Sequence, residues 1–429
     1  MTAAKVNLWG SEIGTIIYDD RDETIKFSYN KEFVESGIEL APIKMPLNNS
    51  VYTFLDLKST SFNGLPGLFA DSLPDTFGNY LINEYLSRQG RPENSMNPVE
   101  KLLYVGNRGP GALEYRPATQ IEDYKGNLEI DELTNLIEKI ITQRENLVIS
   151  TKEENAMEHL IQIGSSAGGS RAKINIAWNE KENIIRSGQI IAGEGFSYWI
   201  LKFDSAKNNE NSVIKPNDRE YTKIEYAYYL MATSAGINMS ECRLLKDGEC
   251  SHFITKRFDR TDDYQKIFMQ SLAAIAHFDY RMPRSNSYEQ MARVMNEMNI
   301  SQSEKEQTFK RIIFNDLSKN YDDHVKNFGF LMNKQGEWHI SPAYDVSYVY
   351  NPNGKYAKEH QMTMNNKSNN LRFEDFVLCA KQFNISERKV KDMLEEISDA
   401  ISKWPYFAQK AELSEKRMLE IKENQNEIV

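Results

Sequence analysis

The first part of the chain alternates apolar and polar residues, a pattern typical of β-strands. The alternation runs through KVNLWGSEIGTIIYD (5–19) and TIKFSYN (24–30), with a polar turn between them. Since successive side chains of a strand point to opposite faces, the pattern predicts paired antiparallel strands. Between residues 61 and 115 glycine and proline recur among aromatic residues, in FNGLPGLFADSLPDTFGNYLI and LLYVGNRGPGALEY. These glycines predict tight turns.

Two later segments repeat apolar residues at helical spacing. In DELTNLIEKIITQREN (131–146) Asp131 is a candidate N-cap, and the apolar face is Leu133, Leu136, Ile137, Ile140 and Ile141. In ERKVKDMLEEISDAISKW (387–404) the corresponding face is Val390, Met393, Leu394, Ile397 and Ile401. From about residue 265 onward the pattern predicts a largely helical region.

The middle of the chain predicts a second group of strands. From about residue 160 the sequence IQIGSSAGGSRAKINIAW indicates a strand, a glycine loop and another strand, and SYWILKFDSA (197–206) indicates a further strand. A helix is predicted in KIEYAYYLMATSAG (223–236), and strands around CRLLKDG and SHFITKRFDR follow it. One Asn-rich stretch, YNPNGKYAKEHQMTMNNKSNN (350–370), resembles low-complexity sequence.

Length and composition describe an ordinary globular protein. The chain has 429 residues, 40% of them hydrophobic and 27% charged, which is enough for two or three lobes with sizeable cores. It has no apolar run long enough for a transmembrane helix and no signal-peptide pattern at its start. The net charge of −10 argues against nucleic-acid binding by counterion release alone.

The cysteines indicate a reducing compartment. Only Cys242, Cys250 and Cys379 are present, an odd and sparse set that fits the cytoplasm better than a disulfide framework. Cys242 and Cys250 lack a matching Cys/His pair, so they do not predict a zinc site. We therefore expect a cytoplasmic protein without a membrane segment.

The order of the elements predicts a two-lobed, protein-kinase-like α+β fold. A strand-rich lobe with a glycine loop and a lysine strand precedes a helix with a glutamate and then a helical lobe. Phosphoryl transfer needs backbone amides over the phosphates, a lysine to neutralise them and metal ligands to hold magnesium. We expect an added β-rich N-terminal subdomain over 1–150, a kinase N-lobe over 151–262 and a helical C-lobe over 263–429.

Lys202 is the candidate phosphate-binding lysine. It lies in the apolar strand WILKF, where a lysine is costly to bury without an anionic partner. Glu225, on the following predicted helix, is either its orienting carboxylate or a solvated helix residue. The loop from Ser166 to Lys173 offers backbone amides to phosphate oxygens, although glycines flanked by serines also form simple hairpin turns.

The stretch NYDDHVKNFGFLMNKQGEWHISPAYD (320–345) carries the candidate catalytic residues. Asp322 and Asn327 have the Asp-x-x-x-x-Asn spacing of a catalytic loop, in which the aspartate faces the acceptor hydroxyl and the asparagine faces magnesium. Asp345 follows a predicted strand-turn-strand, in the place of a second magnesium ligand. His324 either contacts nucleotide or fixes the loop, and Asp323 has no assigned role.

In these motifs the sequence resembles the HipA family of serine/threonine-protein kinase toxins from bacterial toxin–antitoxin modules. The resemblance covers nearly the whole chain. It rests on LWGSEIGTI, FNGLPGLFADSLPD, YVGNRGPGALEY, SSAGGSRAK, KRFDR, DDHVKNFGFL and ISPAYDVS, which occur in the family's order. The resemblance assigns the glycine-rich pieces between 61 and 115 to the family's N-terminal subdomain.

The resemblance implies roles for individual residues. Asp322 resembles the catalytic aspartate, Asn327 and Asp345 the magnesium ligands, and Lys202 the phosphate-contacting lysine. The nucleotide loop matches Gly168, Gly169, Ser170, Arg171, Ala172 and Lys173, and further ATP contacts match Lys256, Arg257, Phe258, His324, Val325, Lys326 and Asn327. The family's autophosphorylated serine aligns with Ser166, and Ser165 beside it is the alternative.

The resemblance also implies a function. Such kinases use ATP and Mg²⁺, target aminoacyl-tRNA synthetases, stall translation and cause growth arrest and persistence. Autophosphorylation of the glycine-rich loop limits them, and a helix-turn-helix antitoxin similar to HipB restrains them. DNA contact is expected only through that antitoxin.

Two other readings of the motifs remain open. The same phosphoryl-transfer machinery serves kinases of small molecules or lipids, and nothing in the motifs separates these from protein kinases. A kinase-like protein that binds a repressor without turnover is the second alternative. The presence of Lys202, Asp322, Asn327 and Asp345 argues against it, because a pure binding protein has no need of all four.

Overall fold

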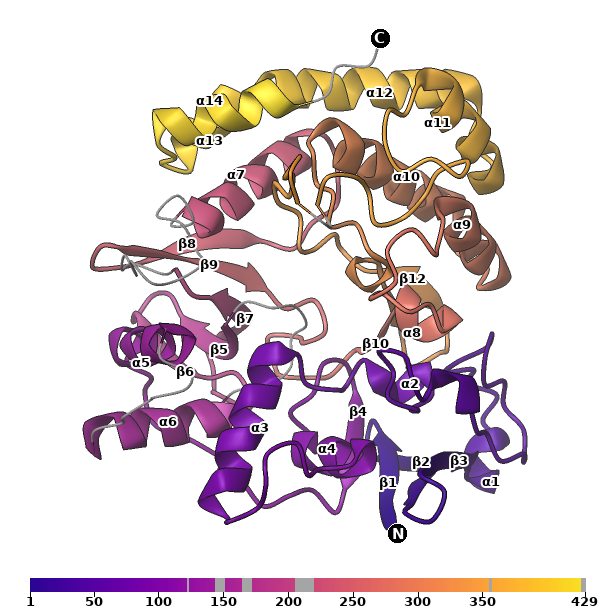
Figure 1. Cartoon of the computed structure of the whole chain (residues 1–429), viewed down its shortest axis with the longest axis vertical. Coiled ribbons are helices and arrows are strands. Elements are labelled where there is room, and N and C mark those ends of the chain that lie inside the picture. The colour runs from indigo at the N-terminus through magenta and orange to yellow at the C-terminus, as the bar shows by residue number, and fades with distance from the viewer. Residues whose placement is uncertain (122, 143–150, 164–171, 205–219, 355–356, 426–429) are drawn as a thin grey trace. The chain divides into compact units, whose positions relative to one another are not determined.

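The protein divides into two compact units. The computed structural model describes residues 1–429 except 122, 143–150, 164–171, 205–219, 355–356 and 426–429 (Figure 1). Unit one comprises Met1–Phe33, Ser72–Thr222 and Glu241–Ile267, and unit two comprises Val34–Asp71, Lys223–Ser240 and Phe268–Val429. The domain boundaries expected at 150 and 262 stay predictions.

Unit one contains a four-stranded antiparallel sheet built mainly from the N-terminal strands. Its order is β3-β2-β1-β4, with β1 at Thr2–Leu8, β2 at Ser11–Asp19, β3 at Thr24–Tyr29 and β4 at Leu113–Arg116. The predicted antiparallel pairing of the first strands is therefore confirmed. The short helix α1 (Lys31–Val34) follows β3, and α4 (Pro98–Val105) packs against β1.

A second sheet of unit one carries the lysine strand. It has five strands in the order β6-β5-β7-β9-β8. Their bounds are Lys173–Asn179 for β5, Ile184–Ser187 for β6, Ser197–Lys202 for β7, Cys242–Asp247 for β8 and Cys250–Lys256 for β9. Neighbouring strands run antiparallel, and β7 lies in the centre between β5 and β9.

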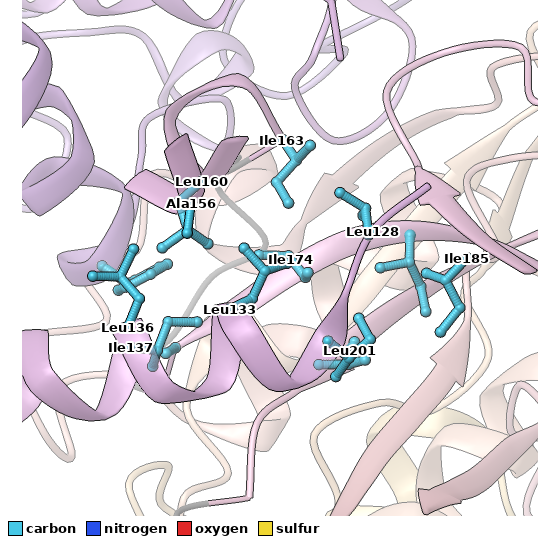
Figure 2. Packing of buried hydrophobic residues seen from close by; sticks show 14 of the residues in the cluster. Leu128, Leu133, Leu136, Ile137, Ala156, Leu160, Ile163, Ile174, Ile185 and Leu201 are labelled. Carbon is cyan, nitrogen blue, oxygen red and sulfur yellow. The ribbon is translucent and has the colours of Figure 1, made fainter. Parts of the chain in front are cut away.

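Helices α3 (Thr76–Arg88), α5 (Ile130–Thr142) and α6 (Thr151–Ile163) supply an apolar core with this sheet. Figure 2 shows side chains of α5 and α6 directed toward Ile174 of β5 and Leu201 of β7. The predicted face of α5 is buried at Leu133, Leu136, Ile137 and Ile140, while the burial of Ile141 lies outside the described part. The 3.6-residue periodicity thus identified the core side of α5 correctly.

Removing a core side chain should measurably destabilise unit one. Leu160 of α6 is fully buried in this cluster, so Leu160→Ala should lower the free energy of unfolding by about 2–5 kcal/mol, because it leaves a cavity. Urea denaturation followed by circular dichroism measures this change. The matched control is Leu378→Ala on a helix of unit two, where the side chain is 52% exposed and the same change should cost less than about 0.5 kcal/mol.

Unit two is largely helical around a small sheet. The sheet has the order β10-β11-β12, with bounds Phe268–Ser271, Gly329–Met332 and Trp338–Ile340. Its longer helices are α7 (Tyr221–Ser234, the first two residues in unit one), α9 (Tyr288–Glu297), α10 (Gln302–Leu317), α11 (Phe373–Ala380), α12 (Glu387–Ser402) and α14 (Glu415–Asn424). Shorter ones are η1 (Leu55–Leu57), α2 (Gly67–Ala70), α8 (Leu272–Ala276), η3 (Val325–Asn327), η4 (Lys381–Phe383) and α13 (Trp404–Lys410).

Local sequence explains where the central helices begin. Ser287 starts α9 and Ser301 starts α10, and each serine forms a capping box with the Gln290 or Glu304 side chain three residues later. The predicted apolar face of α12 is buried throughout. Within the described residues, no helix is both long and apolar enough to cross a membrane.

The structure corrects three predictions. Residues 161–163 form the last turn of α6 rather than a strand before the glycine loop. Asp131 lies in the first turn of α5, which begins at Ile130, so it is not the N-cap. The segment 61–115 contains α2, α3 and α4 besides turns, because Asp75 and Asn97 cap helices that the glycines obscured.

Candidate functional site

The expected catalytic loop lies in unit two between α10 and β11. Asn327 ends η3, and its side-chain Nδ2 donates to the backbone carbonyl of Asp322 at 2.7 Å. The Asp-x-x-x-x-Asn segment is therefore closed on itself. The Asp322 side chain is 48% exposed, and its Oδ1 lies 3.7 Å from His324 Nε2. A carboxylate held on a fixed loop and open to solvent can accept a proton from an arriving hydroxyl.

The predicted strand-turn-strand after this loop is confirmed. Strands β11 and β12 pair antiparallel, and the chain then leads to Asp345. The backbone of Asp345 is left-handed, with φ of 54°. An L-residue with a side chain pays about 1–2 kcal/mol for that conformation, which aspartate tolerates better than most residues. Tyr344 beside it donates from its hydroxyl to the carbonyl of Lys326 at 2.6 Å.

Arg311 ties the two expected magnesium ligands to one another. This buried residue of α10 donates from Nη2 to the carbonyl of Asn327 and, at 2.9 Å, to the carbonyl of Tyr344. Its guanidinium lies 4.5 Å from the ring centre of Phe328. Burial lowers the pKa of Arg311, while nearby tyrosines and carboxylates oppose that effect. One side chain thus fixes the backbone of Asn327 relative to the backbone that precedes Asp345.

A buried ionic cluster includes Asp323, the residue that follows Asp322. His360 Nδ1 is 2.7 Å from Asp323 Oδ2, and its Nε2 is 3.0 Å from Asp316 Oδ1. The hydroxyl of Tyr288 also contacts Asp323 Oδ2. Burial alone would lower the pKa of His360, but the two carboxylates outweigh it and raise the pKa to about 9. Asp323, to which the sequence assigned no role, is therefore a buried anchor of the loop.

Lys202 and Lys173 form a basic pair in unit one. They are opposite each other on β7 and β5, and both side chains are buried. Lys202 Nζ lies 5.7 Å from the ring centre of Phe253, and Lys173 Nζ lies 4.0 Å from Asp75 Oδ2. Asp75 also accepts the backbone N–H of Gly78 as the N-cap of α3. Two adjacent lysine side chains carry positive charge that can attract a phosphate group, although the Asp75 carboxylate offsets part of it.

Lys256 and Arg257, two of the residues expected to contact ATP, form ion pairs within unit one. Arg257 makes two hydrogen bonds of 2.8 Å to the carboxylate of Asp259. Arg260 Nη1 also donates to Asp259 Oδ2 at 3.0 Å, and Lys256 pairs with Asp262 at 2.9 Å. Burial would raise the pKa of Asp259, but Arg257 and Arg260 hold it well below its usual range.

Part of the expected nucleotide loop lies outside the described residues. This applies to Ser165, Ser166, Gly168, Gly169, Ser170 and Arg171, whereas Ala172 and Lys173 begin the described strand region. Lys202 belongs to unit one and Glu225 to unit two, so their pairing stays a prediction. The roles of His324, Val325 and Lys326 toward nucleotide also stay predictions.

Sequence reasoning missed Arg311 and His360. Arg311 lies within the apolar run of α10 (FKRIIFN), and an arginine there signals a buried polar partner. His360 lies in the Asn-rich stretch that resembled low-complexity sequence. In the described part of the chain, no three His, Cys, Asp or Glu side chains converge as a metal site. An amide and a carboxylate oxygen, from Asn327 and Asp345, nevertheless suit magnesium that also binds phosphate and water.

Comparisons with known proteins agree with these observations. The HipA-like C-terminal domain model matches residues 165–404, and the HipA N-terminal domain model matches residues 4–116. HipA of Shewanella oneidensis, from the structure of a toxin–antitoxin complex with HipB and operator DNA, is 17% identical with a TM-score of 0.68. The alignment covers 98% of this chain and 95% of that chain. This likeness confirms the predicted α+β, kinase-like fold.

Two curated relatives have related names. A Haemophilus influenzae protein named "Putative kinase" is 26% identical over 163 residues, which cover 34% of this chain and 48% of that protein. The "Putative kinase Y4dM" of Sinorhizobium fredii is 22% identical over 92% of this chain and 89% of its own length. The two domain models together span most of the sequence, and the chain belongs to the HipA family.

Proposed function

We propose that this chain is an ATP- and Mg²⁺-dependent serine/threonine-protein kinase and the toxin of a toxin–antitoxin system. The observation that carries the proposal is the closed Asp322–Asn327 loop, which Arg311 joins to the backbone before Asp345. This loop would provide the base and one metal ligand, and the segment that Arg311 joins to it would provide the second ligand at Asp345, as phosphoryl transfer requires. Family membership and the names of the relatives support the same conclusion.

Each residue has a distinct role in the proposed reaction. Asp322 orients the acceptor hydroxyl and accepts its proton. Lys202 and Lys173 hold the phosphates of ATP through their charges. Asn327 and Asp345 would hold magnesium, which when bound neutralises phosphate charge as the phosphoryl group is transferred. Further nucleotide contacts are proposed for Gly168–Lys173, Lys256–Phe258 and His324–Lys326.

The proposed partners follow from the family and its solved member. The Shewanella HipA structure contains HipB and operator DNA, so we propose a HipB-like helix-turn-helix antitoxin that contacts DNA for this chain. We propose an aminoacyl-tRNA synthetase as the protein substrate and Ser166 or Ser165 as the autophosphorylated residue. Phosphate there would add about −1.5 to −2 charges to a loop proposed to hold ATP, and so limit activity.

Labelled ATP tests the proposed reaction directly. Purified chain, Mg²⁺, γ-labelled ATP and bacterial lysate are incubated together, and products are separated by size. We expect label on serine or threonine of protein, and loss of transfer when EDTA removes the metal. Label found in small molecules or lipids would reject the protein-kinase assignment. Absence of any phosphoryl transfer would reject the proposal that the chain is an enzyme.

The strand lysine should control nucleotide affinity. Lys202→Met keeps an apolar chain of similar length but removes the charge, so the Kd for ATP should rise by about 10-fold or more. Isothermal titration calorimetry measures it. The control is Lys246→Met on β8 of the same sheet, where the lysine is exposed and ATP affinity should not change. Equal ATP affinity of Lys202→Met and wild type would show that Lys202 does not bind phosphate.

A further inference from the structure

His360 is held between two carboxylates from different elements. One ring nitrogen faces Asp323 at 2.7 Å and the other faces Asp316, at the end of α10, at 3.0 Å. Ionised carboxylate oxygens only accept hydrogen bonds, so each ring nitrogen must donate. When both carboxylates are ionised, these two contacts fit a doubly protonated, positively charged ring. All three side chains are buried, which makes the two negative charges costly without that positive charge.

The contacts of His360 and its neighbour reach both sides of Asp322. The backbone N–H of Gln361 donates to Asp323 Oδ1 at 2.7 Å, and its side-chain amide donates to the carbonyl of Tyr321 at 3.3 Å. The Tyr321 ring centre lies 4.3 Å from that of His360. Residues 321 and 323 are thus fixed, while the Asp322 side chain between them stays about half exposed.

The segment that carries His360 leads into a tight hairpin turn. Asn365 and Asn366 both have positive φ, which is the geometry of a tight hairpin turn. Met364 and Lys367 pair across the turn, and the backbone N–H of His360 donates to the carbonyl of Ser368 at 2.9 Å. The asparagines that resembled low-complexity sequence therefore build the turn that places His360.

We propose that His360 is a positioning residue that holds the catalytic loop through Asp323 and thereby sets the rate at which Asp322 acts, without touching substrate. The proposal rests on the proposed kinase function of this loop. Loss of the ring charge would leave Asp323 and Asp316 as buried anions near Asp322. The loop would then relax, and small displacements of a reacting group cost about 100-fold in rate.

Other groups around His360 matter for its charge state. Burial would raise the pKa of Asp323, but His360 outweighs it and keeps Asp323 ionised, so the pair is charged at neutral pH. Glu359, which precedes His360, is bound by Arg284 at 3.1 Å. Among the described residues, Asp316 of α10 and Asp323 and Tyr321 of the loop face His360. Tyr288 of α9, Arg311 of α10 and Lys319 act on its charge state indirectly, because they interact with Asp323 or Asp316.

Steady-state kinetics of His360→Gln test the proposal. Glutamine can keep hydrogen bonds but not the charge, so kcat should fall by about 100-fold while the KM for ATP changes by less than about twofold. In wild type, kcat should decline as pH rises through about 9, where the ring loses its proton. The variant should lack this decline. Unchanged kcat in folded His360→Gln protein would overturn the proposal.

A matched control and a second measurement separate positioning from folding. His339 also faces a carboxylate, with Nδ1 3.3 Å from Glu304 Oε1, but it lies on β12 and is 54% exposed, so His339→Gln should leave kcat unchanged. If His360→Gln does not fold, NMR of the imidazole nitrogens in the wild type decides. Protons on both ring nitrogens of His360 at pH 7.5 support the proposal that a charged ring holds Asp323 and Asp316. A neutral ring at that pH rejects the proposal. Because NMR needs no turnover, a wild type without kinase activity refutes the proposed function and leaves the ring measurement valid.

Discussion

Asp322→Ala is expected to lower phosphoryl transfer by about 10³-fold and leave the protein folded. Removal of a positioned general base typically costs about 10²–10⁴-fold in rate. The side chain is half exposed, and Asn327 bonds to the backbone carbonyl of Asp322 rather than to its carboxylate, so the loop keeps that bond. Single-turnover transfer from labelled ATP measures the rate, and circular dichroism reports the fold.

Growth provides a second readout of the same variant. Expression of the wild-type chain without antitoxin should arrest growth, and Asp322→Ala should not. Asp399→Ala on α12 is the control, because this aspartate is exposed and pairs only with the nearby Lys403 in the described structure. Growth arrest by the catalytically inactive variant would favour a binding protein that acts without turnover.

The largest loss of stability is expected from Asp259→Ala in unit one. Asp259 faces both Arg257 and Arg260 and also accepts the backbone N–H of Gly111 at 2.8 Å. Removal would leave two buried guanidinium groups without their carboxylate. Breaking a buried ion pair in this way costs about 3–5 kcal/mol. Urea unfolding should show the change, whereas Asp262→Ala, at an exposed ion pair, should cost less than about 1 kcal/mol.

The difference in stability between wild type and Asp259→Ala should depend on pH in a defined direction. The folded protein holds the pKa of Asp259 below the ordinary value of 3.8. The contribution of Asp259 to stability is therefore fully present above about pH 4. It disappears as the pH falls through the lower pKa that Asp259 has in the folded protein. Wild type and Asp259→Ala should differ most near neutral pH and converge in acid. A difference that stays constant down to pH 2 would show that the carboxylate charge is not responsible.

The sequence predicted elements whose pattern is local. The face of α12 was readable because five apolar residues recur at helical spacing and nothing interrupts them. The short stretch Ile161–Ile163, in which a glutamine separates two isoleucines, was misread as a strand, because three residues do not distinguish the two periods. Asp75 and Asn97 begin helices, yet nearby glycines and prolines gave a stronger local signal for turns.

In the candidate site, too, features that depend on short sequence spacing were predicted, whereas contacts between residues far apart in the sequence were not. Asp322 and Asn327 were predicted from their local spacing, and the hydrogen bond between them closes that segment into a loop, while their catalytic roles stay predictions. The two partners of His360 lie 37 and 44 residues away in sequence, and Arg311, which donates to the carbonyl of Asn327, comes from a separate helix. Such pairings arise from tertiary packing, and a single sequence carries no periodic trace of them.

The left-handed backbone at Asp345 limits which substitutions at this position leave the protein folded, and so affects how the gene for this chain can be inactivated during evolution. Asparagine and glycine both accept this conformation, and each is one base change from an aspartate codon. Neither supplies the carboxylate. Under the proposed toxin function, a lineage that loses its antitoxin gene thus has a short mutational route to an inactive protein that still folds. We expect decaying copies to carry asparagine or glycine at this position more often than valine, whose branched side chain disfavours the same backbone.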